Sequence, residues 1–365
     1  MKVALVASSY LPRPGALARH VEELARGLSR RGVDVEVLAQ DRALPFPPVS
    51  EFDGFVVRRF VTSVGHAHFA VAPGLWEHLR RTAPSVDVVH AHTAHLPVAL
   101  ASARAHPRQF ILTPHVSVER LLRWGSLRMT RAVIGRAAQT VCSAATEARL
   151  LRARFPWAAD RISVVPPGVD VAAVRAARSF DHPGAVVVSA APLERHQHIG
   201  RAIAALPALG PAFRLGIVGD GPARQRLLAH ASDLRVSQRV EFVGSVPDAE
   251  RYRWLRTARV AVALAEHDTS GIHVVEALAA GVPMVASDIP VHREAAEYAD
   301  GAAVRFVSPT TSPLEIADLL YEAAESPVPR TGRSRLPTWD DAVESTLALY
   351  MSVTRGRIPA AVVGG

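Results

Sequence analysis

The chain is almost devoid of lysine and cysteine, and these shortages exclude several kinds of chemistry. Among its 365 residues there is a single lysine, Lys2, and a single cysteine, Cys142. Without an internal lysine the chain can form no Walker A loop and offers no internal anchor for a pyridoxal Schiff base. One cysteine allows no internal disulfide, and we interpret Cys142, which follows an apolar helical run, as a buried small hydrophobe rather than a nucleophile.

Long hydrophobic runs are absent as well. No apolar stretch approaches the roughly 20 residues that a membrane-spanning helix needs. The segment 1–7 is too short for a signal peptide, has no cleavage-like site after it, and fits a buried strand better. These features predict a cytoplasmic protein.

The net charge of +8 is carried almost wholly by arginine. A positive balance predicts attraction to anions such as phosphate-bearing small molecules, nucleic acid or acidic membranes. The arginines are scattered among acids without aromatic interleaving, so we do not expect nucleic acid as a partner. A basic segment surrounds Trp124 and contains Arg120, Arg123, Arg128 and Arg131. It can be a solvated face, the interpretation that we favour, or a surface that makes a peripheral contact with the inner membrane face.

Short β-branched runs alternate with helical patterns along most of the chain, which predicts an α/β fold with doubly wound parallel sheets. The expected strands are 3–7, 33–39, 86–90, 110–113, 139–142 and 162–165, followed by 185–190, 214–218, 240–242, 260–263 and 284–287. The alternation breaks at 165–170 and at a polar linker, 179–184, and then restarts. We therefore expect two Rossmann-like domains, residues 1–170 and 184–335, with a helix at 339–353 packing back on the first and a mobile tail at 355–365. Ligands bind at the carboxyl ends of such sheets, so an interdomain cleft is expected to hold the site.

The segment 265–288 has the highest density of candidate site residues. A small polar loop opens a helix there, and the free N–H groups of a helix N-terminus attract anions. Asp268 lies in the loop and Glu276 lies eight positions on, about two helical turns away. Spacing alone leaves two interpretations open: both carboxylates face the hydroxyls of one ligand, or Asp268 is a helix N-cap and Glu276 is solvated.

This segment resembles the E-x7-E signature of the retaining glycosyltransferases of family 4, which have the GT-B fold. Over residues 1–350, other pieces resemble the family in the family's order: 14–25, 87–92, 113–115, 165–170, 218–222, 242–244 and 286–294. The resemblance implies two Rossmann-like domains facing a cleft. It also implies sugar transfer from a UDP- or GDP-linked donor with retention of anomeric configuration, and with no cofactor. No Asp-x-Asp triplet appears, which agrees with a metal-independent reaction.

The resemblance also implies roles for individual residues. Asp268 matches the first glutamate, which contacts donor-sugar hydroxyls, and Glu276 matches the second, which holds the ribose. His115 matches an active-site histidine near the transferred sugar, although by residue type alone it is better interpreted as a satisfied core histidine. His90 and His92 are interpreted as polar groups at a strand end. The remaining donor-binding positions are the glycine pair Gly15 and Ala16, the base-binding Gly244 and Val246, and the loop Thr269, Ser270, Gly271 and Ile272.

The chain departs from the family where the leaving diphosphate is normally neutralised. Pro192 stands in place of the family's arginine and Gln197 in place of its lysine. One preorganised hydrogen-bond donor aimed at the charge of the leaving diphosphate stabilises the transition state by about 3–4 kcal/mol, so the missing arginine and lysine need replacement. Arg195, His196 and His198 lie in the same segment and can supply the positive charge. The alternative is a catalytically weakened family member that acts as a partner or scaffold subunit.

The acceptor cannot be assigned from the sequence. In the family it is set by loops of the first domain, here 43–48 and 63–73, and these loops carry no signature. A glycan, a lipid-linked molecule and a small molecule all remain open.

Overall fold

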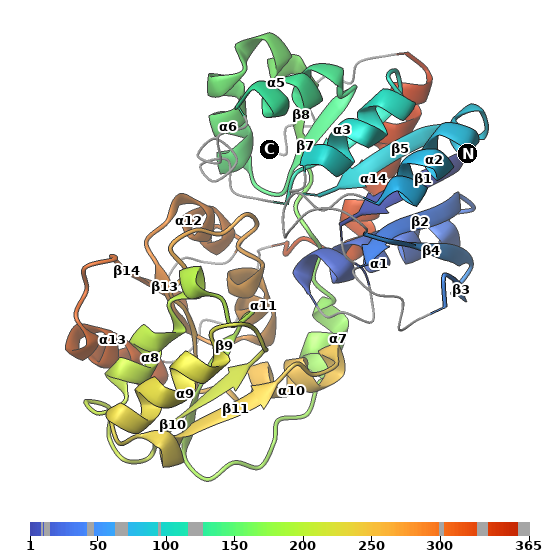
Figure 1. Ribbon diagram of the computed structural model, residues 1–365. Coiled ribbons are helices and arrows are strands. Elements are labelled where there is room, and N and C mark those ends of the chain that lie inside the picture. Colours follow the sequence, from blue (N-terminus) through green and yellow to red (C-terminus); the bar gives the residue numbers. More distant parts are fainter. Residues whose placement is uncertain are drawn as a thin grey trace. The chain divides into compact units, whose positions relative to one another are not determined.

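A computed structural model describes residues 1–8, 10, 15–41, 47–62, 72–93, 96–115, 127–298, 303–326 and 335–356. Trp124, Arg120 and Arg123, most of loops 43–48 and 63–73, and the tail beyond residue 356 lie outside the described residues. The chain divides into two compact units, Met1–Gly168 with the C-terminal segment from Trp339, and Val169–Thr338 (Figure 1). Over the described residues, no helix has both the length and the apolar character to cross a bilayer.

In the described part of the first unit, eight strands form one sheet. In spatial order they are β3 (Val49–Phe52), β4 (Phe55–Val61), β2 (Asp34–Asp41), β1 (Lys2–Ala7), β5 (Val88–His92), β6 (Phe110–Thr113), β7 (Gln139–Cys142) and β8 (Ile162–Val164). Each predicted strand is present, with its ends shifted by at most two residues. Cys142 is buried at the end of β7, as expected.

The edge of this sheet differs from the prediction, because β3 runs antiparallel to β4. Asp53 and Gly54 join the two strands with φ values of 33° and 89°, which matches the two-residue turn preferred in hairpins. The other strand pairs of this sheet are parallel. The hairpin therefore adds one antiparallel strand to a doubly wound sheet.

Helices cover both faces of this first sheet. Along β1, Val3, Leu5 and Ala7 pack into one core and Ala4 and Val6 into the other, as a strand apolar at every position requires. One face is covered by α1 (Ala16–Arg30) and α14 (Trp339–Thr354). The other is covered by α2 (Pro73–Thr82), α3 (Leu96–Ala105), α5 (Leu127–Arg136) and α6 (Ala145–Arg154).

Helix α14 packs on α1, although more than 300 residues separate Arg31 from its ion-pair partner Asp340 at 2.9 Å. The helices approach so closely at Gly27 that a Cβ there would lie 2.4 Å from Val343 Cγ2. Glycine at this position therefore permits the C-terminal helix to close the core of the first unit.

In the described part of the second unit, six strands form a wholly parallel sheet. In spatial order they are β11 (Val240–Gly244), β10 (Phe213–Val218), β9 (Ala185–Ala190), β12 (Val260–Ala263), β13 (Met284–Ser287) and β14 (Val304–Val307). The helices are α7 (Val171–Ala176), α8 (Ile199–Ala205), α9 (Arg224–Asp233), α10 (Asp248–Thr257), α11 (Ile272–Ala280), α12 (Pro290–Ala296) and α13 (Pro313–Glu325). Strand β14 and helix α12 were not predicted, whereas the predicted strands are all present.

Each sheet has one point where the strand order reverses. In the first sheet the chain moves outward from β1 through β2 on one side and from β5 on the other, so the reversal lies between β1 and β5. In the second it lies between β9 and β12. The loops leaving these strands diverge to opposite faces and open a crevice, so each reversal point is where a ligand is expected.

Candidate functional site

The loops that leave β9 and β12 are joined at the reversal point of the second sheet. The N–H of Glu266 donates to the carbonyl of His196 at 2.8 Å, which links the two loops through main chain. The imidazoles of His196 and His267 stack with centroids 4.4 Å apart and planes within 15°. These two loops, residues 191–198 and 264–271, are called the donor edge below.

Asp268 shapes the loop in which it lies. Its Oδ1 accepts the N–H groups of Thr269 at 2.6 Å and Ser270 at 3.2 Å. Helix α11 then begins after Gly271, its N-cap, where φ is 63° and a Cβ would lie 2.6 Å from that of Ala295. The N-cap interpretation of Asp268 is therefore wrong, because the carboxylate binds loop amides before the helix.

The second oxygen of Asp268 faces a fully buried histidine from α12. Asp268 Oδ2 lies 3.4 Å from His292 Nε2, and His292 Nδ1 lies 3.1 Å from the carbonyl oxygen of Ser287. A carbonyl only accepts, so Nδ1 donates in this contact and Nε2 is the nitrogen that faces the carboxylate. Burial acts to raise the pKa of Asp268, but His292 and the charge of His273 outweigh it and hold that pKa well below its usual value.

Asp268→Asn is expected to lower the free energy of unfolding by about 1.5–3 kcal/mol at pH 7, the scale of hydrogen bonds to a charged group. Because the pKa of Asp268 is lowered by folding, its stabilisation is complete above pH ~4 and falls as the pH drops further. Denaturant unfolding followed by circular dichroism measures both effects. Asp288→Asn is the matched control, since Asp288 pairs with Arg293 at an exposed site. Equal losses in the two variants would contradict this role for Asp268.

Glu276 is buried on α11, with 1% of its surface exposed, and forms an ion pair with Arg251 of α10. Arg251 is also 3.0 Å from Asp248 and lies over the ring of Tyr252. The interpretation of Glu276 as a solvated side chain is therefore wrong. Together with His273, Glu276 lines a small pocket beside Ala190 and Ala191, where β9 ends.

The segment that departs from the family pattern forms a short 3-10 turn, Arg195–Gln197, after β9. Gln197 is buried, and its amide nitrogen lies 3.1 Å from His196 Nε2. Glu194 pairs with His196 at 3.2 Å, and His198 with Glu266 at 3.5 Å. The Arg195 side chain is exposed and makes no hydrogen bond or ion pair within the described residues. Arg195 is thus the cation of this turn whose guanidinium stays available to an anion.

Four further candidate site residues are divided between the units, with Gly244 and Val246 in the second and Gly15 and Ala16 in the first. Gly244 ends β11 with φ 86°, and its carbonyl accepts the N–H of Gly219 at 2.8 Å. Val246 packs half-buried against the core that includes α11. Gly15 is the N-cap residue of α1 and Ala16 its first residue. A Cβ at Gly15 would meet no atom within 4 Å, so no contact within the described chain requires glycine there.

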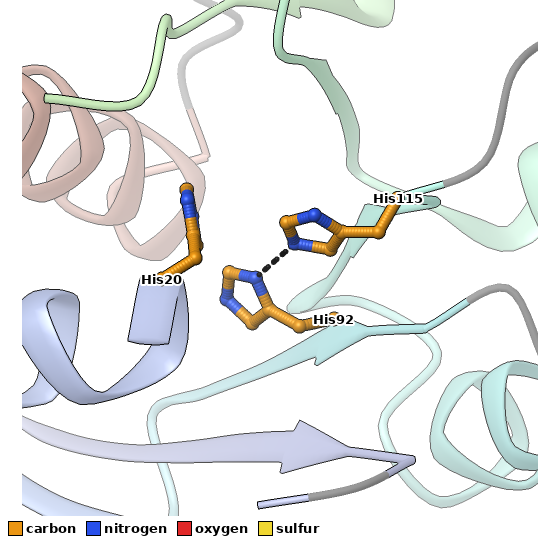
Figure 2. Close-up of side chains that lie close together, drawn as sticks. All are labelled: His20, His92 and His115. Atoms are coloured by element: carbon orange, nitrogen blue, oxygen red, sulfur yellow. Dashed lines mark hydrogen bonds between the residues drawn. The ribbon is translucent and has the colours of Figure 1, made fainter. Parts of the chain in front are cut away.

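Three histidines gather at the reversal point of the first sheet: His20 from α1, His92 from the end of β5, and His115 two residues after β6 (Figure 2). His92 Nδ1 lies 3.1 Å from His115 Nε2, and the ring of His20 lies 4.8 Å, edge-on, from that of His115. His115 has φ 46°, a strained left-handed conformation for a non-glycine residue, which is typical of functional sites. These residues, His20, His92 and His115, are called the histidine cluster below.

Burial keeps the histidine cluster neutral. It lowers the pKa of His20 to about 4, an effect to which the charge of Arg19 adds. It also lowers the pKa values of His92 and His115 well below the usual value, and the neighbouring imidazoles add to the effect. Each ring therefore offers one N–H donor and one lone pair at neutral pH.

His90 is a structural histidine on the same strand. Its Nδ1 lies 2.7 Å from the Tyr350 hydroxyl and its Nε2 2.8 Å from Thr113 Oγ1, so both nitrogens have partners. This contact ties β5 to α14 and agrees with the interpretation of His90 as a polar group near a strand end. His115, by contrast, is not a solitary core histidine, because two other imidazoles surround it.

Several residues of these sites were not predicted from the sequence, namely His20, Arg251, His267 and His292. Arg251 lies 25 residues before its partner Glu276, and His292 lies 24 residues after Asp268, each on a different helix. No spacing rule connects such pairs, because packing in three dimensions brings them together.

Two doubly wound α/β units in one chain match a class of proteins, the two-domain α/β enzymes of GT-B architecture. Comparison with family models gives the same result, since Glycosyltransferase Family 4 matches residues 17–173 and Glycosyl transferases group 1 matches residues 170–334. The chain therefore belongs to the family 4 glycosyltransferases, which confirms the resemblance seen in its motifs.

Individual relatives match over nearly the whole chain. The chain is 28% identical to the glycogen synthase of Mycobacterium tuberculosis, over 98% of this chain and 96% of that protein. Sucrose-phosphate synthase from Thermosynechococcus elongatus has the same fold, with a TM-score of 0.78, 16% identity, and coverage of 98% and 100%. Anabaena HepE in complex with UDP-glucose also matches, with a TM-score of 0.70, 17% identity and 98% coverage of both chains.

Proposed function

We propose that this glycosyltransferase moves a hexose from a UDP- or GDP-linked donor to an acceptor hydroxyl, with retention of anomeric configuration and without a metal ion. The observation that carries the proposal is the donor edge, with Arg195 and Asp268 in its two loops, together with Glu276 on α11, which follows the second loop; all three lie around the reversal point of one parallel sheet. Carboxylates there suit hydroxyl groups, and a guanidinium suits a diphosphate. The likeness to HepE, which binds UDP-glucose, supports the donor class.

Each candidate residue is assigned to one part of the nucleotide-sugar donor. Glu276 accepts a hydrogen bond from the ribose, and Arg251 holds its carboxylate in place. Arg195 meets the diphosphate, and the main chain of the loop from Thr269 to Ile272, with Gly15 and Ala16, lies against the phosphate and sugar. Gly244 and Val246 contact the base. His115 donates its N–H to a hydroxyl of the transferred sugar, since it is neutral.

A panel of nucleotide sugars with mass detection tests this function. The protein is incubated with each donor in chelator, and donor hydrolysis and transfer to glycan, lipid-linked and small-molecule acceptors are recorded. Turnover of one donor in chelator supports the proposal. If turnover absolutely requires added metal, the proposal that the reaction needs no metal ion is wrong.

A second candidate is a weakened family member that acts as a partner or scaffold subunit. It is favoured by Pro192, which cannot carry charge, and by Gln197, whose amide is buried against His196. Calorimetry separates the two candidates. An absence of binding of UDP, GDP and nucleotide sugars at millimolar concentration favours the scaffold.

His115→Ala is expected to reduce kcat about tenfold and to change the affinity for the nucleoside diphosphate less than about twofold. The loss corresponds to one neutral hydrogen bond of roughly 1–1.5 kcal/mol made to the sugar in the transition state. Steady-state kinetics and calorimetry with the diphosphate measure the two effects. His230→Ala, on α9 of the other unit, is the control. Equal losses of turnover and diphosphate affinity in His115→Ala would contradict a role at the sugar.

A further inference from the structure

The histidine cluster contains more imidazoles than the proposed transfer reaction uses. One ring nitrogen of each residue lies within 4.8 Å of one from both others, and no other group of three or more possible metal ligands with this spacing occurs among the described residues. Figure 2 shows the rings of His92 and His115 beside each other and His20 facing them from α1. All three residues belong to the first unit, so the cluster needs no residue from the second.

The spacing within the cluster approaches that of a tetrahedral metal site. Two imidazole nitrogens bound to one zinc ion at about 2.0–2.1 Å lie roughly 3.3 Å apart. His92 Nδ1 and His115 Nε2 are 3.1 Å apart without an ion. The third ligand, His20, is a half-buried side chain near the start of α1, and its ligand nitrogen lies within 4.8 Å of those of the other two.

The chemistry of the cluster selects the class of ion. Metal ligands must be deprotonated, and each residue of the cluster offers one imidazole nitrogen as its ligand atom. No carboxylate belongs to the group, and this disfavours Mg²⁺ and Ca²⁺, which prefer oxygen ligands. Imidazole suits zinc, copper and nickel.

His92 adds an independent observation. The residue is fully buried, and its Nε2 has no hydrogen-bond partner in the part of the chain that the structure describes. A buried nitrogen without a partner costs free energy, typically about 1–3 kcal/mol.

We propose that His20, His92 and His115 form a binding site for a transition-metal ion such as Zn²⁺, held by three imidazole nitrogens with a fourth position open to water. Metal binding at this site does not rest on the proposed function.

Titration of the metal-free, full-length protein with Co²⁺ tests the site without an activity assay. We expect one equivalent of Co²⁺ to give the intense visible bands of a tetrahedral complex and Zn²⁺ to bleach them. His20→Gln should weaken binding by about 100-fold or more, since loss of an outer-shell partner alone typically costs about 10–100-fold. His230→Gln, which removes a histidine outside the cluster, should bind like the wild type.

Circular dichroism and thermal unfolding establish that His20→Gln is folded, and His115→Gln repeats the test from a second element. Equal Co²⁺ affinity in the wild type and both cluster variants overturns the proposal, as does the absence of tetrahedral bands at millimolar Co²⁺. If no donor is turned over, the proposed function fails, and the Co²⁺ titration still decides the metal site.

Discussion

Glu276→Ala is expected to lower the free energy of unfolding by about 3–5 kcal/mol, because the largely buried guanidinium of Arg251 loses its buried carboxylate partner and keeps the more exposed Asp248. The Glu276 side chain is 2% exposed and that of Arg251 is 12% exposed, so water cannot replace the lost partner. Removing one member of a buried ion pair costs more than the pair contributes, since the remaining charge keeps its desolvation penalty. The effect should therefore exceed that of an exposed pair many-fold.

Urea unfolding followed by circular dichroism measures this loss, and Glu322→Ala is the control because Glu322 pairs with Arg305 at an exposed position, 3.8 Å away. The double variant Glu276→Leu with Arg251→Met should recover most of the stability, since both charges are removed together. A Glu276→Ala protein as stable as the wild type would show that the pair does not hold α10 to α11.

Glu276 also tests the ribose contact. Glu276→Gln keeps the volume of the side chain and can still accept a hydrogen bond. In this variant, the affinity for the nucleoside diphosphate should fall by about 1.5–3 kcal/mol if a charge-assisted hydrogen bond to the ribose is lost. Calorimetry at a temperature where the variant is folded measures it, and unchanged affinity would remove Glu276 from the donor site.

The burial of Glu276 illustrates what the sequence could and could not predict. Helix α11 is apolar on every side, with eight of its nine residues buried, and such a helix is expected inside a domain. A carboxylate in it must be paired. The identity of the partner depends on how α10 packs against α11, which no local pattern encodes.

The fold itself was largely predictable, because strands buried on both faces appear as continuous apolar runs. The hairpin of β3 and β4 was missed, although its Asp53-Gly54 turn is a strong local signal, since β3 is short and mostly exposed. The histidine cluster was missed for a different reason. His20 lies in α1, His92 ends β5 and His115 follows β6, and only the parallel order of β1, β5 and β6 brings them to one edge.

The proposed diphosphate contact depends on Arg195, whose side chain has no hydrogen bond or ion pair in the part of the chain that the structure describes. The neighbouring carboxylate, Glu194, pairs with His196 at 3.2 Å and not with Arg195. Gln197 is buried and Pro192 is uncharged, so neither replaces a cation. The main chain around Arg195 is held, because the His196 carbonyl is bonded to Glu266 of the neighbouring loop. A fixed backbone with an unpaired guanidinium suits an anion that arrives with the substrate.

Arg195→Ala is therefore expected to lower kcat by about 100-fold or more, the scale of losing one preorganised donor to a developing negative charge. Arg195→Lys should restore activity only in part, because an ammonium lacks the planar fork that binds two phosphate oxygens at once. Steady-state kinetics with the donor found in the panel give both values, and Arg226→Ala, which removes an exposed arginine from α9, should leave turnover unchanged. Wild-type turnover in Arg195→Ala would contradict the replacement. The charge would then have to come from His196 or His198, whose carboxylate partners Glu194 and Glu266 offset it, and the weakened-enzyme hypothesis would gain support.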